Sequence, residues 1–251
     1  MEKMDGQIKK TCVEYKDFPA YVGSEVVLKG MIHRIREMTG FAFVIVRTAR
    51  DVVQCVYSPD FSDYRMDESV VEGCAVKITG KIVKDQTRDD RFEMQIHGIE
   101  VLSSPAEQMP IVINKKQLDN ISIDLNLNLR PVTLRNPKER AVFKVQEGIA
   151  RGFREFLFSQ NFTEIRTPKI CAQGAEGGAN IFKLDYFGKQ VFLAQSPQFY
   201  KQMLVPVYER VFEVGPVFRA EHHDTSRHLN EYVSMDFEMG FIDSFYDIMN
   251  M

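Results

Sequence analysis

The stretch that decides the fold is Val211 to Met239, VFEVGPVFRAEHHDTSRHLNEYVSMDFEM. Polar and apolar side chains alternate at both of its ends, which predicts two strands joined by a polar loop. Arg219 and Glu221 share one face of the first strand. In the returning strand one face carries Tyr232, Ser234, Asp236 and Glu238, and we expect the other face to enter a core with Val233, Met235, Phe237 and Met239. Arg219 beside carboxylates predicts a phosphate or carboxylate ligand, and a surface hairpin with ordinary ion pairs is the alternative.

This stretch resembles motif 2 of the class II aminoacyl-tRNA synthetases. The resemblance lies in GPVFRAE, in a loop that ends in RHLNE, and in DFEM. Upstream, FTEIRTPKI resembles motif 1 of the class, whose proline corresponds to Pro168, and the stretches AEGGANIF and LAQSPQFYKQ resemble the amino-acid-site loops of aspartyl-tRNA synthetases. The four matches occur in the order and spacing of the family. They imply activation of L-aspartate by ATP, transfer to tRNA(Asp), and a homodimer formed through motif 1 at Pro168.

The resemblance also implies an ATP site at the end of the first strand. There Arg219 is the expected catalytic residue, which grips the α-phosphate, and Glu221 orders the adenine. The loop donors Arg227 and His228 are expected to meet the terminal phosphates, and Mg²⁺ is expected as part of the ATP complex. The alternative for the loop is a metal site formed by His222, His223, Asp224 and His228. A loop without helical ligand spacing disfavours that alternative, and we predict no protein-bound metal.

The amino-acid site is expected around a short helix. Ser196-Pro197 is a good helix start, and Gln198 and Lys201 would then share one helical face. By resemblance, Lys201 holds the side-chain carboxylate of aspartate with Gln198 nearby, Asp236 seats the amino acid, and Glu176 of a glycine-rich loop engages the α-ammonium. A buried lysine left unpaired would also penalise neutral asparagine.

Composition sets limits on the rest of the prediction. The chain has 251 residues, 44% of them apolar, enough for one or two cores. Its four cysteines form no CxxC pair, and there is no leading apolar segment and no long apolar run, so we expect a cytoplasmic protein without a membrane span. The net charge of −3 argues against broad attraction to nucleic acid, so tRNA binding would need local basic patches.

The chain divides into two parts, which predicts an α+β protein. Five alternating segments between residues 21 and 103 predict a small closed barrel, assigned to a domain over residues 1–104. Residues 105–137 contain Pro105, Pro110 and Pro131 before the Pro137 at their end and show little periodicity, which predicts a hinge or linker. Asn136-Pro137 and the spacing of Val142, Val145, Ile149, Phe153 and Phe156 predict a helix at the start of a domain over residues 138–251.

The first domain resembles the anticodon-binding OB-fold of aspartyl-, asparaginyl- and lysyl-tRNA synthetases. In FAFVIVR, if Val44 and Val46 fill the barrel, the phenylalanines point outward as stacking platforms for bases. By resemblance, Phe43, Gln54 and Glu93 meet the anticodon bases. The alternative is that Phe43 is core and Glu93 merely solvated. Charges expected to neutralise anticodon-stem phosphates are Arg34, Arg36 and Arg47.

The sequence departs from the family at Met251, where it stops soon after motif 2. Motif 3, the second half of the antiparallel catalytic sheet and a second cation for the aspartate side chain would follow there, so we expect a fragment or truncated product without activity of its own. Two alternatives stay open. One is an asparaginyl-tRNA synthetase, which usually lacks QSPQ and carries Glu where Asp236 stands, and the other is a non-catalytic RNA-binding protein that kept the barrel.

Overall fold

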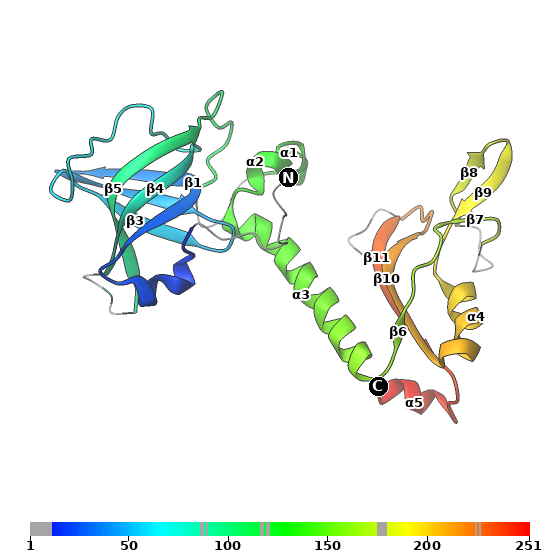
Figure 1. Ribbon diagram of the computed structural model, residues 1–251. Helices are drawn as coiled ribbons and strands as arrows, with labels where there is room; N and C mark the ends of the chain where they lie inside the picture. The colour runs from blue at the N-terminus through cyan, green and yellow to red at the C-terminus, as the bar shows by residue number, and fades with distance from the viewer. Residues whose placement is uncertain are drawn as a thin grey trace, which may run out of the picture. The chain divides into compact units, whose positions relative to one another are not determined.

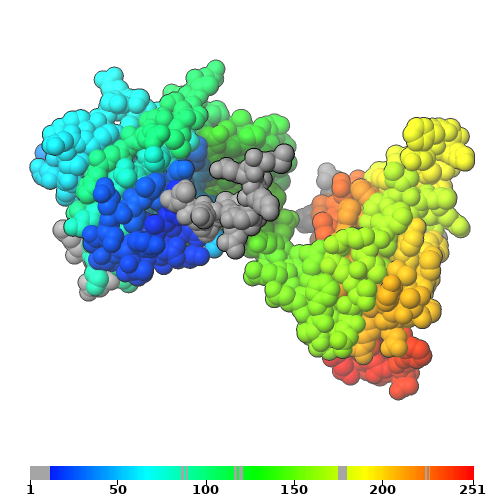
Figure 2. Space-filling model, viewed as in Figure 1, coloured from blue at the N-terminus to red at the C-terminus, as the bar shows by residue number. Residues whose placement is uncertain are grey.

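The computed structural model describes residues 12–85, 88, 90–115, 118, 121–174, 180–223, 225 and 227–251. They form two units, one that runs to Arg140 and one from Ala141 to Met251 (Figure 1). Figure 2 shows the same units with their atoms drawn as spheres. The first unit is a β-barrel with short helices, and the second combines helices with two small sheets. The α+β class predicted from the sequence is confirmed.

Five strands close the barrel of the first unit in the order β1-β2-β3-β5-β4 (Figure 1). They are β1 (Glu25–Met38), β2 (Phe41–Arg47), β3 (Val52–Tyr57), β4 (Ala75–Lys84) and β5 (Phe92–Ser103). All neighbouring pairs are antiparallel except β3 and β5, which run parallel, and β4 closes the barrel against β1. The alternation in the sequence therefore located the barrel strands correctly.

The barrel interior is apolar and tightly packed. Val44 and Val46 are fully buried, and the alternation leaves Phe43 half-buried on the opposite face, as predicted. A Cβ atom at Gly80 would lie 2.1 Å from the carbonyl oxygen of Gln95, so only glycine allows β4 and β5 to approach this closely. The 3-10 helix η1 (Tyr15–Tyr21) adds Phe18 to the same core.

The segment between barrel and second unit contains two short helices, α1 (Ile123–Asn128) and α2 (Arg130–Thr133). With six and four residues, they are too short to show the apolar periodicity that marks a helix in sequence. The long helix α3 (Pro137–Ser159) begins where the sequence predicts. Asn136 caps it, because its Oδ1 accepts a hydrogen bond from the backbone N–H of Lys138 at 2.9 Å.

The second unit contains two three-stranded sheets. One has the order β11-β10-β6, and the other the order β7-β9-β8. The strands are β6 (Thr163–Glu164), β7 (Ile170–Cys171), β8 (Lys183–Tyr186), β9 (Lys189–Leu193), β10 (Arg210–Phe218) and β11 (Glu231–Met239). The helices α4 (Gln198–Tyr208) and α5 (Phe245–Met249) complete the unit. The predicted pair of strands around the decisive stretch is thus β10 and β11, antiparallel over their full length.

The core of the second unit is small and centres on Phe212. The ring of Phe153, from α3, lies 5.9 Å from the ring of Phe212, and Phe237 and Met239 of β11 pack on the same cluster. The expectation that Val233 and Met235 also enter a core is wrong, since they are 64% and 42% exposed. They line an open groove of about 800 Å³ between α3 and the β10–β11 pair instead of packing under a covering element.

Candidate functional site

Four side chains from neighbouring barrel strands gather on one surface of the first unit. Arg36 lies on β1, Phe43 on β2, Gln54 on β3 and Glu93 on β5. Because these strands are consecutive in the barrel, residues distant in sequence become neighbours. We call this group the barrel cluster. It brings together the three residues that the sequence assigned to anticodon bases and adds Arg36, which the sequence assigned to phosphates.

Hydrogen bonds connect the polar members of the barrel cluster. Arg36 Nη2 donates to Gln54 Oε1 at 3.5 Å, and Gln54 Nε2 donates to Glu93 Oε2 at 3.1 Å. The guanidinium of Arg36 lies 5.2 Å from the centre of the Phe43 ring, a cation–π contact, and the Phe41 ring packs on Phe43 edge to face at 5.2 Å. The result is a half-buried aromatic face bordered by an amide and a carboxylate, which suits a flat, hydrogen-bonding ligand.

Charge near this surface is unevenly distributed. Burial raises the pKa of the Glu93 carboxyl; the hydrogen bond from Gln54 opposes this rise, and repulsion by Asp85 adds to it. Arg34 and Arg36 are exposed. Arg47 is buried and donates to the carbonyl of Arg135, and burial together with the charges of Arg140 and Arg135 lowers its pKa to about 10. Arg47 therefore does not share the open surface on which the sequence placed it.

A second group lies where α4 meets β11. Lys201 is 5% exposed, and its ammonium lies 3.3 Å from Glu238 Oε2 and 3.5 Å from Asp236 Oδ1. Gln198, one helical turn earlier, donates to Glu238 Oε2 at 3.3 Å. Helix α4 begins at Gln198, one residue later than predicted, and Ser196 Oγ accepts the N–H of Gln198 at 3.1 Å. We call Gln198, Lys201, Asp236 and Glu238 the lysine pocket.

The lysine pocket contains three of the four residues that the sequence assigned to aspartate. Glu238 joins them because it lies two residues beyond Asp236 on the same face of β11. The fourth, Glu176, lies outside the described residues. Two carboxylates already face one ammonium here, so a further carboxylate would have to compete for the charge of Lys201.

Gln195 is a polar residue that the sequence analysis quoted within QSPQ without giving it a role. Its side chain is buried, and its Nε2 donates to the carbonyl of Asn180 at 3.3 Å. Its Oε1 has no hydrogen-bond partner among the residues that the structure describes. A buried amide oxygen left in this state is an acceptor site for a ligand or water. In sequence, the only signal was its position next to the predicted helix start.

The end of β10 is held beside this region. The backbone N–H of Phe218 donates to Ala194 O at 2.9 Å, and that of Ala220 donates to Asn180 O at 3.0 Å. These two bonds place the start of the loop after β10 next to Ala194, which precedes Gln195, and next to Asn180, whose carbonyl also accepts from Gln195 Nε2. Arg219 and Glu221, the predicted ATP residues, come directly after β10 in the chain. This strand borders the predicted amino-acid site.

Within the loop, His228 Nε2 lies 3.6 Å from Glu221 Oε2, and His228 Nδ1 lies 2.7 Å from the hydroxyl oxygen of Thr225. Arg219 is fixed through its backbone N–H, which donates to Asn230 O at 2.9 Å. Arg227 is exposed, and its backbone N–H donates to Thr225 Oγ1 at 3.3 Å. The structure thus places Glu221 next to His228. The side chain of Arg227 has no hydrogen-bond or ion-pair partner among the described residues of the loop. Asp224 lies outside the described residues.

A buried ion pair fixes the segment that resembles motif 1. Glu213 of β10 is 3% exposed and accepts hydrogen bonds from the Thr167 N–H at 3.0 Å, the Thr167 hydroxyl at 2.8 Å and Lys169 Nζ at 2.9 Å. Pro168, between the donor residues Thr167 and Lys169, is exposed. The network orients the turn and leaves the proline on the surface.

The described ranges contain neither a metal-binding group nor a membrane-spanning helix. No group of three or more histidine, cysteine, aspartate or glutamate side chains there is arranged to hold a metal ion. No helix among those residues has the length and apolar character needed to cross a bilayer.

Comparison with family models matches both parts of the chain. Residues 122–251 match the model described as tRNA synthetases class II (D, K and N), and residues 26–102 match an OB-fold nucleic acid binding domain. The barrel cluster falls within the second match, and the lysine pocket and the end of β10 fall within the first.

Curated relatives agree with these matches. The chain is 44% identical over 248 residues to the aspartate–tRNA(Asp/Asn) ligase of Deinococcus radiodurans, covering 99% of this chain and 55% of that protein. The corresponding ligase of Thermus thermophilus is 44% identical over 236 residues, which cover 94% of this chain and 54% of the relative. The chain therefore spans about half the length of the curated relatives it matches.

Solved structures show the same architecture. Asparaginyl-tRNA synthetase from Pyrococcus horikoshii, complexed with asparaginyl-adenylate, superimposes with a TM-score of 0.86 at 27% identity, over 97% of this chain and 56% of that one. Aspartyl tRNA synthetase from Entamoeba histolytica gives a TM-score of 0.72 at 25% identity, over 100% of this chain and 55% of that one.

Proposed function

The chain belongs to the class II tRNA synthetases of the D, K and N group, and from this premise we propose that it is part of an aspartyl-tRNA synthetase. In this proposal the complete protein activates L-aspartate with ATP and transfers it to tRNA. Names of the relatives with 44% identity support aspartate as the amino acid, and an asparaginyl enzyme resembles the chain at 27% identity. We assign the reaction to the cytoplasm, where protein synthesis takes place.

The observation that carries the choice of aspartate is the buried ammonium of Lys201 in the lysine pocket. A fixed positive charge with little access to water favours a ligand carboxylate over a neutral amide. In our proposal the side-chain carboxylate of aspartate takes a place at Lys201, while Asp236 and Gln195 Oε1 accept hydrogen bonds from its α-ammonium. Glu176 is proposed to meet the same ammonium. Because Glu238 also faces Lys201, full affinity requires a further cation near that carboxylate.

The proposed chemistry needs no protein nucleophile. An oxygen of the aspartate α-carboxylate attacks the α-phosphorus of ATP and forms the acyl–phosphate bond, and the bond to pyrophosphate breaks with its electron pair leaving on pyrophosphate. A ribose hydroxyl of tRNA then attacks the acyl carbon and releases AMP. We place Arg219 at the α-phosphate, Glu221 at the adenine, and Arg227 and His228 at the terminal phosphates. Alignment and charge stabilisation would supply the rate enhancement.

Magnesium enters this proposal only as the ion that accompanies ATP. The carboxylates near the site do not form a metal-binding group within the described residues. Asp236 and Glu238 face Lys201, and Glu221 faces His228. We therefore assign no step to a protein-bound metal.

The barrel cluster is proposed as the site for anticodon bases. One base would stack on Phe43, and Gln54 and Glu93 would read base edges. The relatives are named for tRNA(Asp/Asn), which supports recognition of both the aspartate and the asparagine anticodons. The amide of Gln54 lies between the guanidinium of Arg36 and the carboxylate of Glu93. It can meet a base that the two anticodons share.

A homodimer is the proposed assembly. The α3 side chains Val145 and Ile149 are 59% and 54% exposed, and the groove beside β10 and β11 exposes Leu229, Val233 and Met235. An apolar surface of this kind fits a second copy of the chain. Pro168, exposed beside the buried Glu213 network, is proposed to lie in the same interface.

The experiment that tests the function is ATP–pyrophosphate exchange. We would measure it on this chain and on the chain extended by the remaining half of the Deinococcus radiodurans relative. The extended protein is expected to exchange pyrophosphate with aspartate and not with asparagine. Exchange driven by asparagine would assign the chain to the asparaginyl enzymes. A folded extended protein that binds RNA but exchanges with neither amino acid would support the non-catalytic alternative.

A further inference from the structure

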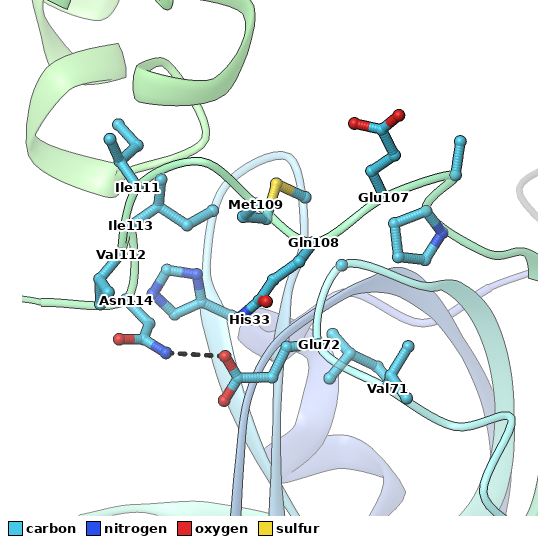
Figure 3. Close-up of a pocket in the computed structure, with 14 residues that line it drawn as sticks. His33, Val71, Glu72, Glu107, Gln108, Met109, Ile111, Val112, Ile113 and Asn114 are labelled. Carbon is cyan, nitrogen blue, oxygen red and sulfur yellow. Dashed lines mark hydrogen bonds between the residues drawn. The ribbon is translucent and has the colours of Figure 1, made fainter.

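A cavity of about 490 Å³ lies on the first unit, between the barrel and residues 105–114 (Figure 3). Its walls are largely apolar and include Ile32, Val71, Met109, Ile111 and Ile113. The volume falls in the range of roughly 300–1,000 Å³ that small-molecule sites occupy. None of the side chains described as lining it belongs to the barrel cluster, so it is a separate feature.

His33 supplies a polar group at the cavity wall because β1 bulges at this residue. Ile32 pairs with Val46 and Arg34 pairs with Ile45, so His33 has no opposite residue in β2. A bulge redirects one side chain, and here two successive residues are both buried, Ile32 in the barrel core and His33 at the cavity. His33 is 8% exposed, and among the described residues no group hydrogen-bonds to its Nδ1.

The walls beside His33 are held by hydrogen bonds. Asn114 Nδ2 donates to Glu72 Oε2 at 3.0 Å (Figure 3), and Glu72 Oε1 accepts the backbone N–H of Ile35 at 3.1 Å. Asn136 Nδ2 donates to the carbonyls of Ile113 at 2.9 Å and of Lys115 at 2.8 Å. Both sides of the cavity are therefore fixed before any ligand arrives, which lowers the entropic cost of binding.

The charges around the cavity restrict the ligand. Glu72 and Glu107 line it, and no lysine or arginine appears among its lining residues, so a phosphate is disfavoured. Burial and the nearby charge of Arg47 lower the pKa of His33, which leaves a neutral imidazole at neutral pH. A suitable ligand is thus uncharged, has flat apolar faces, and brings N–H donors to Nδ1 and to the remaining lone pairs of Glu72.

We propose that this cavity binds an uncharged nucleobase that carries an exocyclic amine, either as a free nucleoside or as a base turned out of an RNA. A nucleobase combines flat faces with N–H donors on one edge. The match of residues 26–102 to a nucleic acid binding barrel supports this class over other heteroaromatic ligands. The site does not depend on synthetase activity, and it can be tested on this chain directly.

The test is a titration of the ¹⁵N-labelled chain, followed through the imidazole nitrogens of its histidines. Adenosine and cytidine are expected to shift the His33 nitrogens in a saturable manner and to leave those of His97 in place. Uridine, which offers a carbonyl oxygen to Glu72 in place of the amine, should bind more weakly. A stem-loop with unpaired adenines that shifts His33 where nucleosides do not would identify the RNA as the source of the base.

Four variants make the result specific. His33→Phe keeps an apolar ring and should weaken adenosine binding about tenfold or more, which corresponds to the loss of one buried hydrogen bond, while His97→Phe should bind as the unaltered chain does. If His33→Phe fails to fold, Val71→Trp should block the cavity from its rim. Phe43→Ala should leave the nucleoside shifts unchanged, which separates this site from the anticodon site. Absence of a saturable shift with adenosine, cytidine and the stem-loop would show that only water enters, and the proposal would be overturned.

Discussion

Lys201 shows at the scale of one residue how burial changes the surroundings of a common side chain. Its ammonium is nearly excluded from water, and its contacts are carboxylates of β11. A ligand that displaces these carboxylates from Lys201 must bring a negative charge of its own to the ammonium. The sequence pointed to this residue through its resemblance to the aspartyl-tRNA synthetases beside QSPQ, and its spacing with Gln198 only placed the two on one helical face. It could not show that Glu238 would already face the same charge.

Replacing Lys201 tests this reading of the pocket. In the extended protein, Lys201→Met should raise the KM for aspartate about tenfold or more, because a charge-assisted hydrogen bond contributes roughly 1.5–3 kcal/mol. Lys189→Met, on an exposed position of β9, is the matched control and should leave KM unchanged. An unchanged KM and unchanged discrimination against asparagine in Lys201→Met would remove Lys201 from the amino-acid site.

The buried imidazole of His33 predicts a dependence of stability on pH. Burial and Arg47 lower its pKa below 6.5, with further contributions from Arg140 and Arg34 and an opposing one from Glu72. The unfolded chain therefore binds a proton near pH 6.5 that the folded chain binds only at lower pH. The contribution of neutral His33 to the free energy of unfolding is therefore fully present above about pH 6.5. It is lost as the pH falls through the pKa that His33 has in the folded chain.

Thermal unfolding followed by circular dichroism between about pH 7 and pH 5 checks this expectation. The unfolding free energy should fall towards pH 5. In His33→Phe, the change of the unfolding free energy with pH should have a smaller slope. His97→Phe serves as the control and should retain it. An identical slope in the wild-type chain and in His33→Phe would contradict the assigned role of this group.

At the scale of elements, the Glu213 network determines how the motif 1 segment attaches to β10. Three donors converge on one carboxylate, and two of them come from Thr167. Such a network is costly to break from one side, because the remaining charge stays buried. The turn that carries Pro168 therefore depends on β10 for its position.

Lys169→Met should destabilise the second unit by about 3 kcal/mol, the lower end of the range for a buried charge that loses its partner. Lys169→Met combined with Glu213→Leu should recover a large part of this loss. Arg166→Met, which removes an exposed partner of Glu164 and leaves Arg154 in contact with that carboxylate, is the control and should cost at most about 1 kcal/mol. Urea unfolding of the four proteins gives these values, and equal losses in Lys169→Met and Arg166→Met would show that the network is not a buried one.

The elements also show which sequence patterns carry structural information. Period-two alternation located all five barrel strands, because one face of each strand is buried in the barrel. The apolar residues spaced three and four apart from Val142 to Phe156, together with Asn136 as the helix cap, located the long helix. The short helices α1 and α2 gave no periodic signal. The outward position of Val233 and Met235 could not be read from alternation, since alternation separates the two faces of a strand but does not reveal whether a partner covers the apolar one.

The same limits apply to the candidate sites. The sequence grouped Phe43, Gln54 and Glu93 through a family resemblance, and the strand order explains physically why they meet. The orphaned oxygen of Gln195 and the bulge at His33 arise from tertiary packing. Neither produces a motif, so only the structure reveals them.

At the scale of the whole molecule, the proposed homodimer accounts for the apolar groove beside α3. Val145→Glu places a charge in that surface and should shift the chain to monomers in sedimentation velocity, with little change in its melting temperature because residue 145 is exposed. Gln190→Glu, at an exposed position of β9 that does not line the groove, controls for the added charge. Equal sedimentation of Val145→Glu and the wild-type chain as dimers would place the interface elsewhere.

A titration with anticodon stem-loops tests most directly whether the barrel of this chain reads the anticodon of the tRNA that an aspartate enzyme charges. The intact chain should bind stem-loops with the aspartate and asparagine anticodons more tightly than one with an unrelated anticodon, at one fixed salt concentration. Phe43→Ala should cost about ten- to a hundredfold in affinity, since stacking contributes on the order of 1–3 kcal/mol per base. Gln54→Ala should mainly reduce discrimination among the loops. Equal binding of every stem-loop by the unaltered chain would contradict the account.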